Sequence, residues 1–177
     1  MAAVLEMLPP AGRVLDVGCG YGRIALPLAQ AGYEVEGLDL SPELVEAARR
    51  GAVEAGVSAR FVVGSMTALP HPDGSFDAVL CLWSAFHELL EEDEQVRAIA
   101  EMSRVLAPGA FALVEGPLAA SPGCVDWVVI EGHSNPHYAH DERTYARVCA
   151  RAGIERFEVY ERDWAGRPRL FLRLERS

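Results

Sequence analysis

A strand-like apolar run leads into three closely spaced glycines in the stretch VLDVGCGYGRIALPLAQAG, residues 14–32. The glycines are Gly18, Gly20 and Gly22, and Asp16 stands just before them. Glycine permits backbone angles that other residues avoid and lets a ligand approach the main chain closely. Such a turn between a strand and a helix predicts a ligand site at the carboxyl edge of a parallel sheet.

The rest of the chain alternates between strand-length apolar runs and helix-length segments. The predicted strands are 13–17, 34–40, 59–64, 76–83 and 110–116. The predicted helices are 23–31, 42–55, 91–107 and 142–152. We expect Ser41 and Asp141 to cap the second and last helices, and Pro108-Gly109 to end the third. The last two runs, 154–164 and 167–176, alternate apolar and polar residues around AGRP and predict a hairpin.

Strand–helix alternation of this kind predicts an α/β fold with right-handed crossovers. We therefore expect a Rossmann-like, doubly wound, mostly parallel seven-stranded sheet with an antiparallel C-terminal hairpin strand. A chain of 177 residues is long enough for one domain with a proper core, so we expect a single domain over 1–177. Segment 117–140 has no assigned structure.

Composition narrows the compartment and the partners. No apolar run reaches the length of a membrane span, and the N-terminus lacks a signal-peptide pattern, so we expect a cytoplasmic protein without membrane association. The four cysteines form no CxxC pair. The net charge is −10 and all 16 basic residues are arginine, which argues against tracking a nucleic-acid backbone.

The spacing of the glycines separates two kinds of nucleotide site. A dinucleotide fingerprint, GxGxxG, would require a glycine at Arg23, whereas this chain has GxGxG. Asp39 ends the second predicted strand, where a carboxylate suits two ribose hydroxyls, but that feature alone does not separate the cofactors.

Four motifs then follow in order: LDVGCGYG, GLDLS, DAVLCLWSAFHEL and EMSRVLAPGA. In this order and at this spacing they resemble the class I S-adenosylmethionine-dependent methyltransferases, most closely the small-molecule methyltransferase-domain type. The specific motifs cover about residues 13–116, and ARAGIERFEVYERD extends the resemblance more loosely to the end. The resemblance implies S-adenosylmethionine as cofactor and methyl transfer to a small-molecule acceptor.

The resemblance also implies roles for individual cofactor-binding residues. Asp16 would orient the methionine end of the cofactor, Asp39 would hold the ribose, and Leu40 would lie against the adenine. Gly18 and Gly20 would offer bare backbone to the methionine and the ribose. Ser65 and Met66 would lie beside the adenine, and Cys81 and Leu82 would lie near the methionine amino group.

Candidate catalytic and substrate residues follow the fourth and fifth predicted strands. The stretch AFHEL makes His87 and Glu88 the catalytic candidates, with a purely structural His87 as the alternative. The substrate candidates are Trp83, Trp127, His133 and Tyr138. The last three lie in 117–140, a usual place in this fold for a substrate-covering insertion. We expect no metal site, because the histidines of HSNPHYAH lack a regular ligand spacing.

Only about a dozen residues precede the first predicted strand. Family members usually carry helices there that close over the cofactor. A cover would therefore come from 117–140, come from a partner chain in a homodimer, or not exist. A non-catalytic module that binds S-adenosylmethionine is the alternative function.

Overall fold

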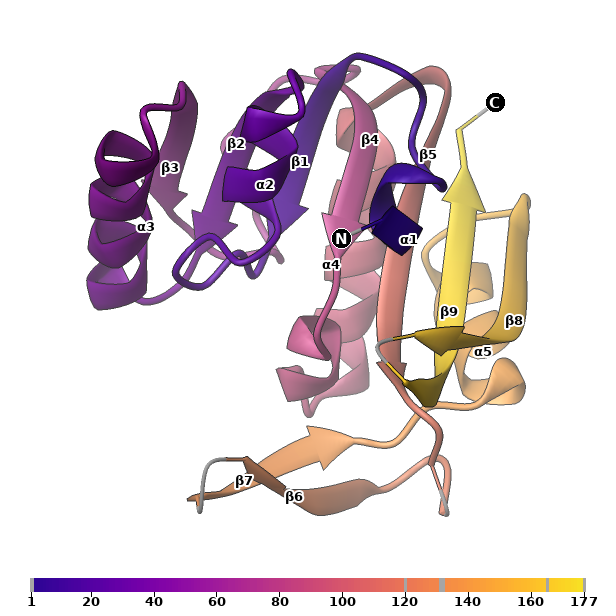
Figure 1. Cartoon of the computed structure of the whole chain (residues 1–177). Coiled ribbons are helices and arrows are strands. Elements are labelled where there is room, and N and C mark those ends of the chain that lie inside the picture. Colours follow the sequence, from indigo (N-terminus) through magenta and orange to yellow (C-terminus); the bar gives the residue numbers. More distant parts are fainter. Residues whose placement is uncertain (1, 120, 131–132, 165, 177) are drawn as a thin grey trace.

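The computed structural model describes residues 2–119, 121–130, 133–164 and 166–176. The strands of its main sheet are β1 (Arg13–Val17), β2 (Glu34–Asp39), β3 (Ala59–Val63), β4 (Phe76–Cys81), β5 (Leu106–Pro117), β8 (Phe157–Trp164) and β9 (Arg167–Glu175). The order across this seven-stranded sheet is β3-β2-β1-β4-β5-β9-β8 (Figure 1). Strands β1 to β5 are parallel, and β9 runs antiparallel to both β5 and β8. The predicted sheet and its antiparallel C-terminal hairpin are thus confirmed.

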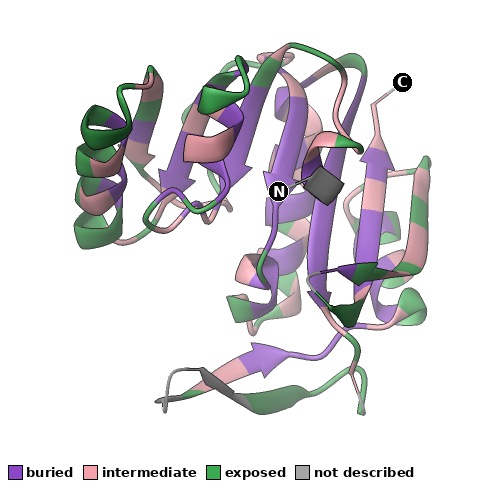
Figure 2. Ribbon diagram, viewed as in Figure 1, coloured by how far each residue is buried: buried purple, intermediate pink, exposed green. Residues whose placement is uncertain are grey.

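Helices cover both faces of the sheet. They are α1 (Ala2–Leu5), α2 (Ala25–Gln30), α3 (Pro42–Ala55), α4 (Glu92–Val105) and α5 (Glu142–Arg151), with a short 3-10 helix η1 (Ala85–Glu88). One apolar core joins α1, α2 and α3 to the sheet, and a second joins α4 and α5 to the opposite face. Adjacent residues of β1 alternate between them, since Val14 packs in the first core and Leu15 in the second. Most residues of the central strands β1, β4 and β5 are accordingly buried (Figure 2).

The order of the strands creates a crevice at their carboxyl ends. From β1 the chain winds outward through β2 and β3, then returns to place β4 on the other side of β1. The connections that leave β1 and β4 therefore diverge, and ligands of open α/β sheets bind at such a switch point.

The predicted helix caps are confirmed. The Ser41 side chain accepts from the Leu44 backbone N–H at 3.2 Å, and Pro42 begins α3. Asp141 and Thr144 form a reciprocal capping box at the start of α5, with both hydrogen bonds at 2.8 Å.

The predicted end of the third helix is wrong. Helix α4 stops at Val105, and Pro108-Gly109 lie inside β5. The side chain of Arg176 donates to the carbonyls of Arg104 and Leu106, which satisfies the last turn of the helix earlier than the sequence suggests. Residues 107–110 then bulge outward before β5 resumes its pairing with β4 at Phe111.

The unassigned segment 117–140 forms a second, two-stranded antiparallel sheet. Its strands are β6 (Val125–Ile130) and β7 (His133–Tyr138). In Figure 1 this hairpin lies beyond the carboxyl ends of the main strands, on the side where the crevice opens. Within the described ranges, no helix is both long and apolar enough to cross a bilayer.

The capping box of α5 gives a direct test of this packing. Replacing Asp141 by alanine removes an accepted hydrogen bond and should lower the free energy of unfolding by about 1 kcal/mol. Urea denaturation would measure the loss. Glu142→Ala changes an exposed carboxylate one residue further on and should shift stability by less than about 0.5 kcal/mol. Equal losses in the two variants would contradict the cap.

Candidate functional site

Two adjoining cavities open at the carboxyl edge of the sheet. The first has a volume of about 630 Å³ and lies over the ends of β1, β2, β3 and β4. The second, of about 540 Å³, extends toward the ends of β5, β7 and the start of β9. Their shared wall consists of Gly18, Gly20, Leu82 and Trp83. One elongated ligand can therefore reach from one cavity into the other.

The glycine turn is required by both backbone angles and space. Gly18 and Gly20 have φ values of +70° and +53°, in the left-handed region that favours glycine. A Cβ atom on Gly18 would lie 2.4 Å from the Cβ of Ala85, so the turn packs tightly against η1. A Cβ on Gly20 would meet nothing within 4 Å, because that position faces open space. Gly20 therefore offers bare main chain to a ligand.

Asp39 ties the end of β2 to this turn. Its Oδ2 accepts from the Gly20 N–H at 2.8 Å, and its Oδ1 accepts from the Ser41 N–H at 2.9 Å. Each carboxylate oxygen can accept more than one hydrogen bond. Because Asp39 also lines the first cavity, its remaining lone pairs can receive two neighbouring hydroxyl groups of a ligand.

Asp16 is a buried carboxyl group at the floor of the second cavity. Its Oδ2 accepts from the Ala25 N–H at 3.1 Å and so caps α2 from the neighbouring strand. Burial raises the pKa of Asp16 to about 7, against the lowering effect of that hydrogen bond. Nearby positive charge on a ligand would favour the ionised form, so Asp16 can hold an ammonium group.

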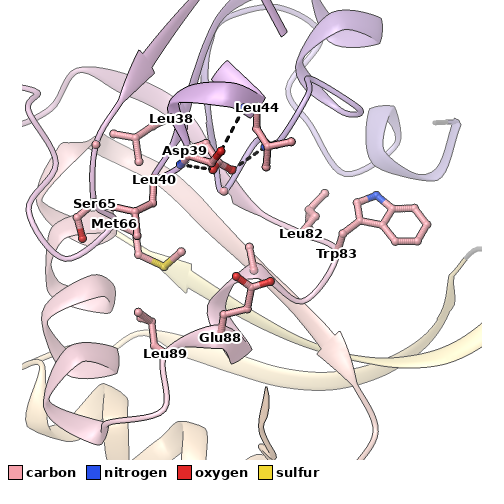
Figure 3. A pocket seen from close by; sticks show the side chains of 15 residues that line it. Leu38, Asp39, Leu40, Leu44, Ser65, Met66, Leu82, Trp83, Glu88 and Leu89 are labelled. Carbon is pink, nitrogen blue, oxygen red and sulfur yellow. Dashed lines mark hydrogen bonds between the residues drawn. The ribbon is translucent and has the colours of Figure 1, made fainter. Parts of the chain in front are cut away.

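The remaining walls of the first cavity suit a flat apolar ring. Leu40 is 74% exposed although it follows a buried strand, and Leu44 and Met66 line the same space. Ser65 also lines it, but its hydroxyl lies 2.8 Å from that of Thr67. Figure 3 shows Met66 and Glu88 directed toward each other across the cavity, with Leu40 on one side and Trp83 on the other.

The end of β4 carries backbone strain. Trp83 and Ser84 have φ values of 58° and 69°, which is uncommon for residues other than glycine. The buried carboxylate of Glu115 compensates, because it accepts from the Trp83 N–H at 2.7 Å and from the side chain of Arg169. Arg169 also donates to the Ser84 hydroxyl at 2.7 Å. Strain held in this way is typical of functional sites.

These contacts fix the indole of Trp83 at the boundary of the two cavities. Its ring centroid lies 4.8 Å from that of Trp164, and the guanidinium of Arg23 stands 4.6 Å from the Trp83 ring. The substrate candidate Trp83 is therefore both exposed to a ligand and held in one orientation.

The structure favours a structural role for His87. Its side chain is fully buried and lines neither cavity. The ring lies 2.9 Å from the Tyr138 carbonyl through Nδ1 and 3.0 Å from the Tyr145 hydroxyl through Nε2. Because a carbonyl only accepts, Nδ1 donates and Nε2 accepts. Burial holds the pKa of His87 well below its usual value, so the ring anchors β7 as a neutral group. Gly116 makes room, since a Cβ there would lie 1.7 Å from Nε2.

The other candidates divide between the cavities and their surroundings. Glu88 lines the first cavity, and burial raises its pKa, with Asp39 adding to the effect. Leu82 lines both cavities, whereas Cys81 is fully buried and lines neither.

The candidates from 117–140 lie away from both cavities or outside the described side chains. Trp127 is 64% exposed on β6. The Tyr138 hydroxyl accepts from Arg147 at 3.3 Å rather than facing a cavity. His133 begins β7, and its side chain lies outside the described part of the structure. Among the described residues, no three His, Cys, Asp or Glu side chains converge on a possible metal position.

Sequence reasoning did not select His137 as a site residue. It lines the second cavity, is 3% exposed, and neither ring nitrogen has a hydrogen-bond partner in the described structure. The only sequence signal was its place among the polar aromatic residues of HSNPHYAH.

Comparison with known proteins agrees with this fold. Residues 14–109 match the family model described as "Methyltransferase domain". A ubiquinone biosynthesis O-methyltransferase of Xanthomonas axonopodis is 35% identical over 97% of this chain and 76% of its own length. A demethylmenaquinone methyltransferase of Thermus thermophilus is 39% identical over 62% of this chain and 48% of its own.

A solved structure of a SAM-dependent methyltransferase from Methanosarcina mazei has the same fold. It aligns with a TM-score of 0.81 at 22% identity, over 99% of this chain and 97% of that one. The chain spans about half the length of several curated relatives that it matches.

The buried Asp16 predicts an unusual pH dependence. Between about pH 4 and about pH 7 the folded state keeps the Asp16 proton that the unfolded chain has released, because the folded pKa is about 7. Rising pH across this window therefore lowers the contribution of Asp16 to stability. Across this pH window the free energy of unfolding of the wild type should fall on the order of 3 kcal/mol more than that of Asp16→Asn, which cannot titrate at this position.

Urea denaturation at a series of pH values measures the difference between the two proteins. Asp126→Asn, which removes an exposed carboxylate on β6, serves as control and should follow the wild type. A wild-type minus Asp16→Asn difference that stays constant with pH would contradict a buried, protonated Asp16.

Proposed function

Because the chain belongs to the methyltransferase-domain family, we propose that it transfers a methyl group from S-adenosylmethionine to a small-molecule acceptor. The observation that carries the proposal is the bare turn at Gly20 held by the Asp39 carboxylate, which opens into an apolar cavity. This arrangement offers a nucleoside two hydroxyl acceptors, main chain for close approach and leucine side chains for its base.

The residues present fit the two halves of this cofactor. Asp39 would hold the ribose hydroxyls, and Leu40 and Met66 would lie against the adenine, with Ser65 near its edge. The methionine half would cross Gly18 and Leu82 into the second cavity. Asp16 would face its ammonium group there, where burial otherwise disfavours the carboxylate form.

The cofactor supplies a methyl group activated by a sulfonium. The protein must align an acceptor with that methyl group and exclude water, which is a matter of proximity and orientation. The bracing of Trp83 by Glu115 and Arg169 suits that task, because it fixes the wall between the cavities. We propose that Glu88 faces the reacting region and that His87 positions β7.

The named reactions of the relatives support a small-molecule acceptor. Three of these relatives are named ubiquinone biosynthesis O-methyltransferase, demethylmenaquinone methyltransferase and 2-methyl-6-phytyl-1,4-hydroquinone methyltransferase. These names describe small organic acceptors rather than macromolecules, in keeping with the −10 net charge of this chain.

The second candidate function is a non-catalytic module that binds S-adenosylmethionine. It is favoured by the fully occupied ring of His87, which leaves that histidine without a free proton acceptor. Transfer of radiolabelled methyl from S-adenosylmethionine to a broad acceptor panel separates the two candidates. Cofactor binding without any labelled product would favour the module.

The cellular setting is also part of the proposal. We place residues 1–177 in one methyltransferase domain that acts in the cytoplasm without a nucleic-acid partner. Four free cysteines suit a reducing compartment. We further propose a homodimer, since Leu118, Val125 and Trp127 expose apolar surface on and just before the β6–β7 hairpin.

Asp39→Asn tests the cofactor site. The amide loses the negative charge and offers one acceptor oxygen in place of two, so affinity for S-adenosylhomocysteine should fall at least about tenfold. Isothermal titration measures the dissociation constants of both proteins.

Glu36→Gln is the matched control, because Glu36 lies on the same strand but lines neither cavity. It should bind like the wild type. Wild-type protein that fails to bind S-adenosylhomocysteine at millimolar concentration would overturn the proposed function. An Asp39→Asn variant of unchanged affinity would overturn the ribose assignment alone.

A further inference from the structure

Two of the arginines that line the second cavity, Arg23 and Arg167, have no acidic partner among the described residues. Arg23 donates to the Tyr21 hydroxyl at 2.8 and 2.6 Å and stands over Trp83, but it forms no ion pair with a described residue. The side chain of Arg167, whose backbone pairs with Trp164 in the sheet, likewise has neither hydrogen bond nor ion pair within the described ranges. Most of the other arginines pair with a carboxylate, as Arg151 does with Glu92 at 2.8 Å, and the exposed Arg97 and Arg143 are exceptions within the described ranges.

The charge balance of this cavity is therefore opposite to that of the chain. Its lining includes Arg23, Arg167 and Arg169, against one carboxyl group, Asp16, whose pKa of about 7 leaves it partly protonated at neutral pH. Arg169 is balanced by Glu115 from below. In a chain of net charge −10, two unbalanced guanidinium groups at one cavity indicate an anionic ligand.

His137 is a second, independent sign of a ligand. Buried polar groups almost always have a hydrogen-bond partner, and this ring has none among the described residues although it lines the cavity. Burial lowers its pKa, so the ring is neutral and can accept a hydrogen bond or a proton. The His140 ring also has no hydrogen-bond partner in the described part of the chain, yet it stacks on Tyr145 at 4.4 Å and lines no part of this cavity.

The wall of the second cavity that is formed by β9 and His137 lies far from the place of the nucleoside. Arg167 and Arg169 belong to β9, which is three strand spacings from β1, or about 14 Å at the usual separation. The glycine turn follows β1 and Asp39 ends β2, at the other side of the crevice, and Arg23 reaches across from the segment after the turn to lie over the Trp83 ring. The wall formed by β9 and His137 therefore lies beyond the cofactor's methionine half, where an acceptor must enter.

We propose that the methyl acceptor is a small organic acid bound in the second cavity, its carboxylate paired with Arg23 and Arg167 and its nucleophilic group facing His137. The inference rests on the proposed function, since it assigns the substrate class of the same site. The oxygen or nitrogen of an acceptor O–H or N–H group uses a lone pair to form a bond to the methyl carbon. The S–CH₃ bond breaks at the same time, and its electron pair stays on sulfur. The acceptor proton passes to a ring nitrogen of His137.

The test compares acids with amides of the same shape. Protein saturated with S-adenosylhomocysteine is titrated with benzoic, hydroxybenzoic and hydroxycinnamic acids and with the matched primary amides. Isothermal titration gives the affinities, and the change in tryptophan fluorescence that is lost in a Trp83→Phe variant reports occupation of the cavity. At least one acid should bind about tenfold or more tightly than its amide. Acids that bind no better than their amides throughout the panel would overturn the proposal.

Variants assign the preference to particular side chains. The double variant Arg23→Gln with Arg167→Gln should remove the difference between acid and amide. Arg50→Gln, on the exposed face of α3 and outside both cavities, should retain it. His137→Phe keeps a ring of similar shape, and it should weaken the hydroxylated acid and its amide by the same factor. Weakening of the acid alone would contradict the placement of the nucleophile.

The carboxylate that pairs with Arg23 and Arg167 could instead be that of the cofactor's methionine half. Affinity of the double variant for S-adenosylhomocysteine should stay within about threefold of the wild type. A loss of more than about tenfold would assign the arginines to the cofactor and overturn the inference. Failure of the wild type to bind S-adenosylhomocysteine would instead overturn the proposed function, so the two failures are distinguishable.

Discussion

The contact between the Asp39 carboxylate and the Gly20 N–H is the constraint on which the site depends. It joins the end of β2 to the turn that follows β1, at the switch point created by the strand order. The glycine angles allow the turn to curve toward β2, and the carboxylate then holds it there. One acid thus shapes the main chain and keeps lone pairs for a ligand, which explains why a carboxylate stands at the end of β2.

A similar device operates at the next strands. Glu115 lies fully buried near the end of β5, where a carboxylate would be costly without partners. Its hydrogen bonds to the strained backbone at Trp83 and to Arg169 satisfy it, and they join β4, β5 and β9 at one point. The crevice therefore has a carboxylate brace on each side, one for the cofactor turn and one for the wall that faces the second cavity.

Most of the sheet could be predicted from sequence, because its strands are short apolar runs bounded by glycine, proline or capping residues. The end of α4 could not, since it depends on Arg176 from the far end of the chain. The same limit applies to the site. The lining of the first cavity follows local motifs, whereas the occupied ring of His87 depends on Tyr138 and Tyr145. His137 becomes a candidate only when the absence of a partner among the described residues is seen in space.

The anchoring of β7 limits the β6–β7 hairpin to two points of attachment to the rest of the fold. The hairpin leaves the main sheet after Pro117 and is pinned again where the Tyr138 carbonyl meets His87. Between these two points its strands pair only with each other in the described ranges. Sequence or length changes in the hairpin would therefore alter the His137 side of the second cavity while leaving the Asp39–Gly20 contact in place.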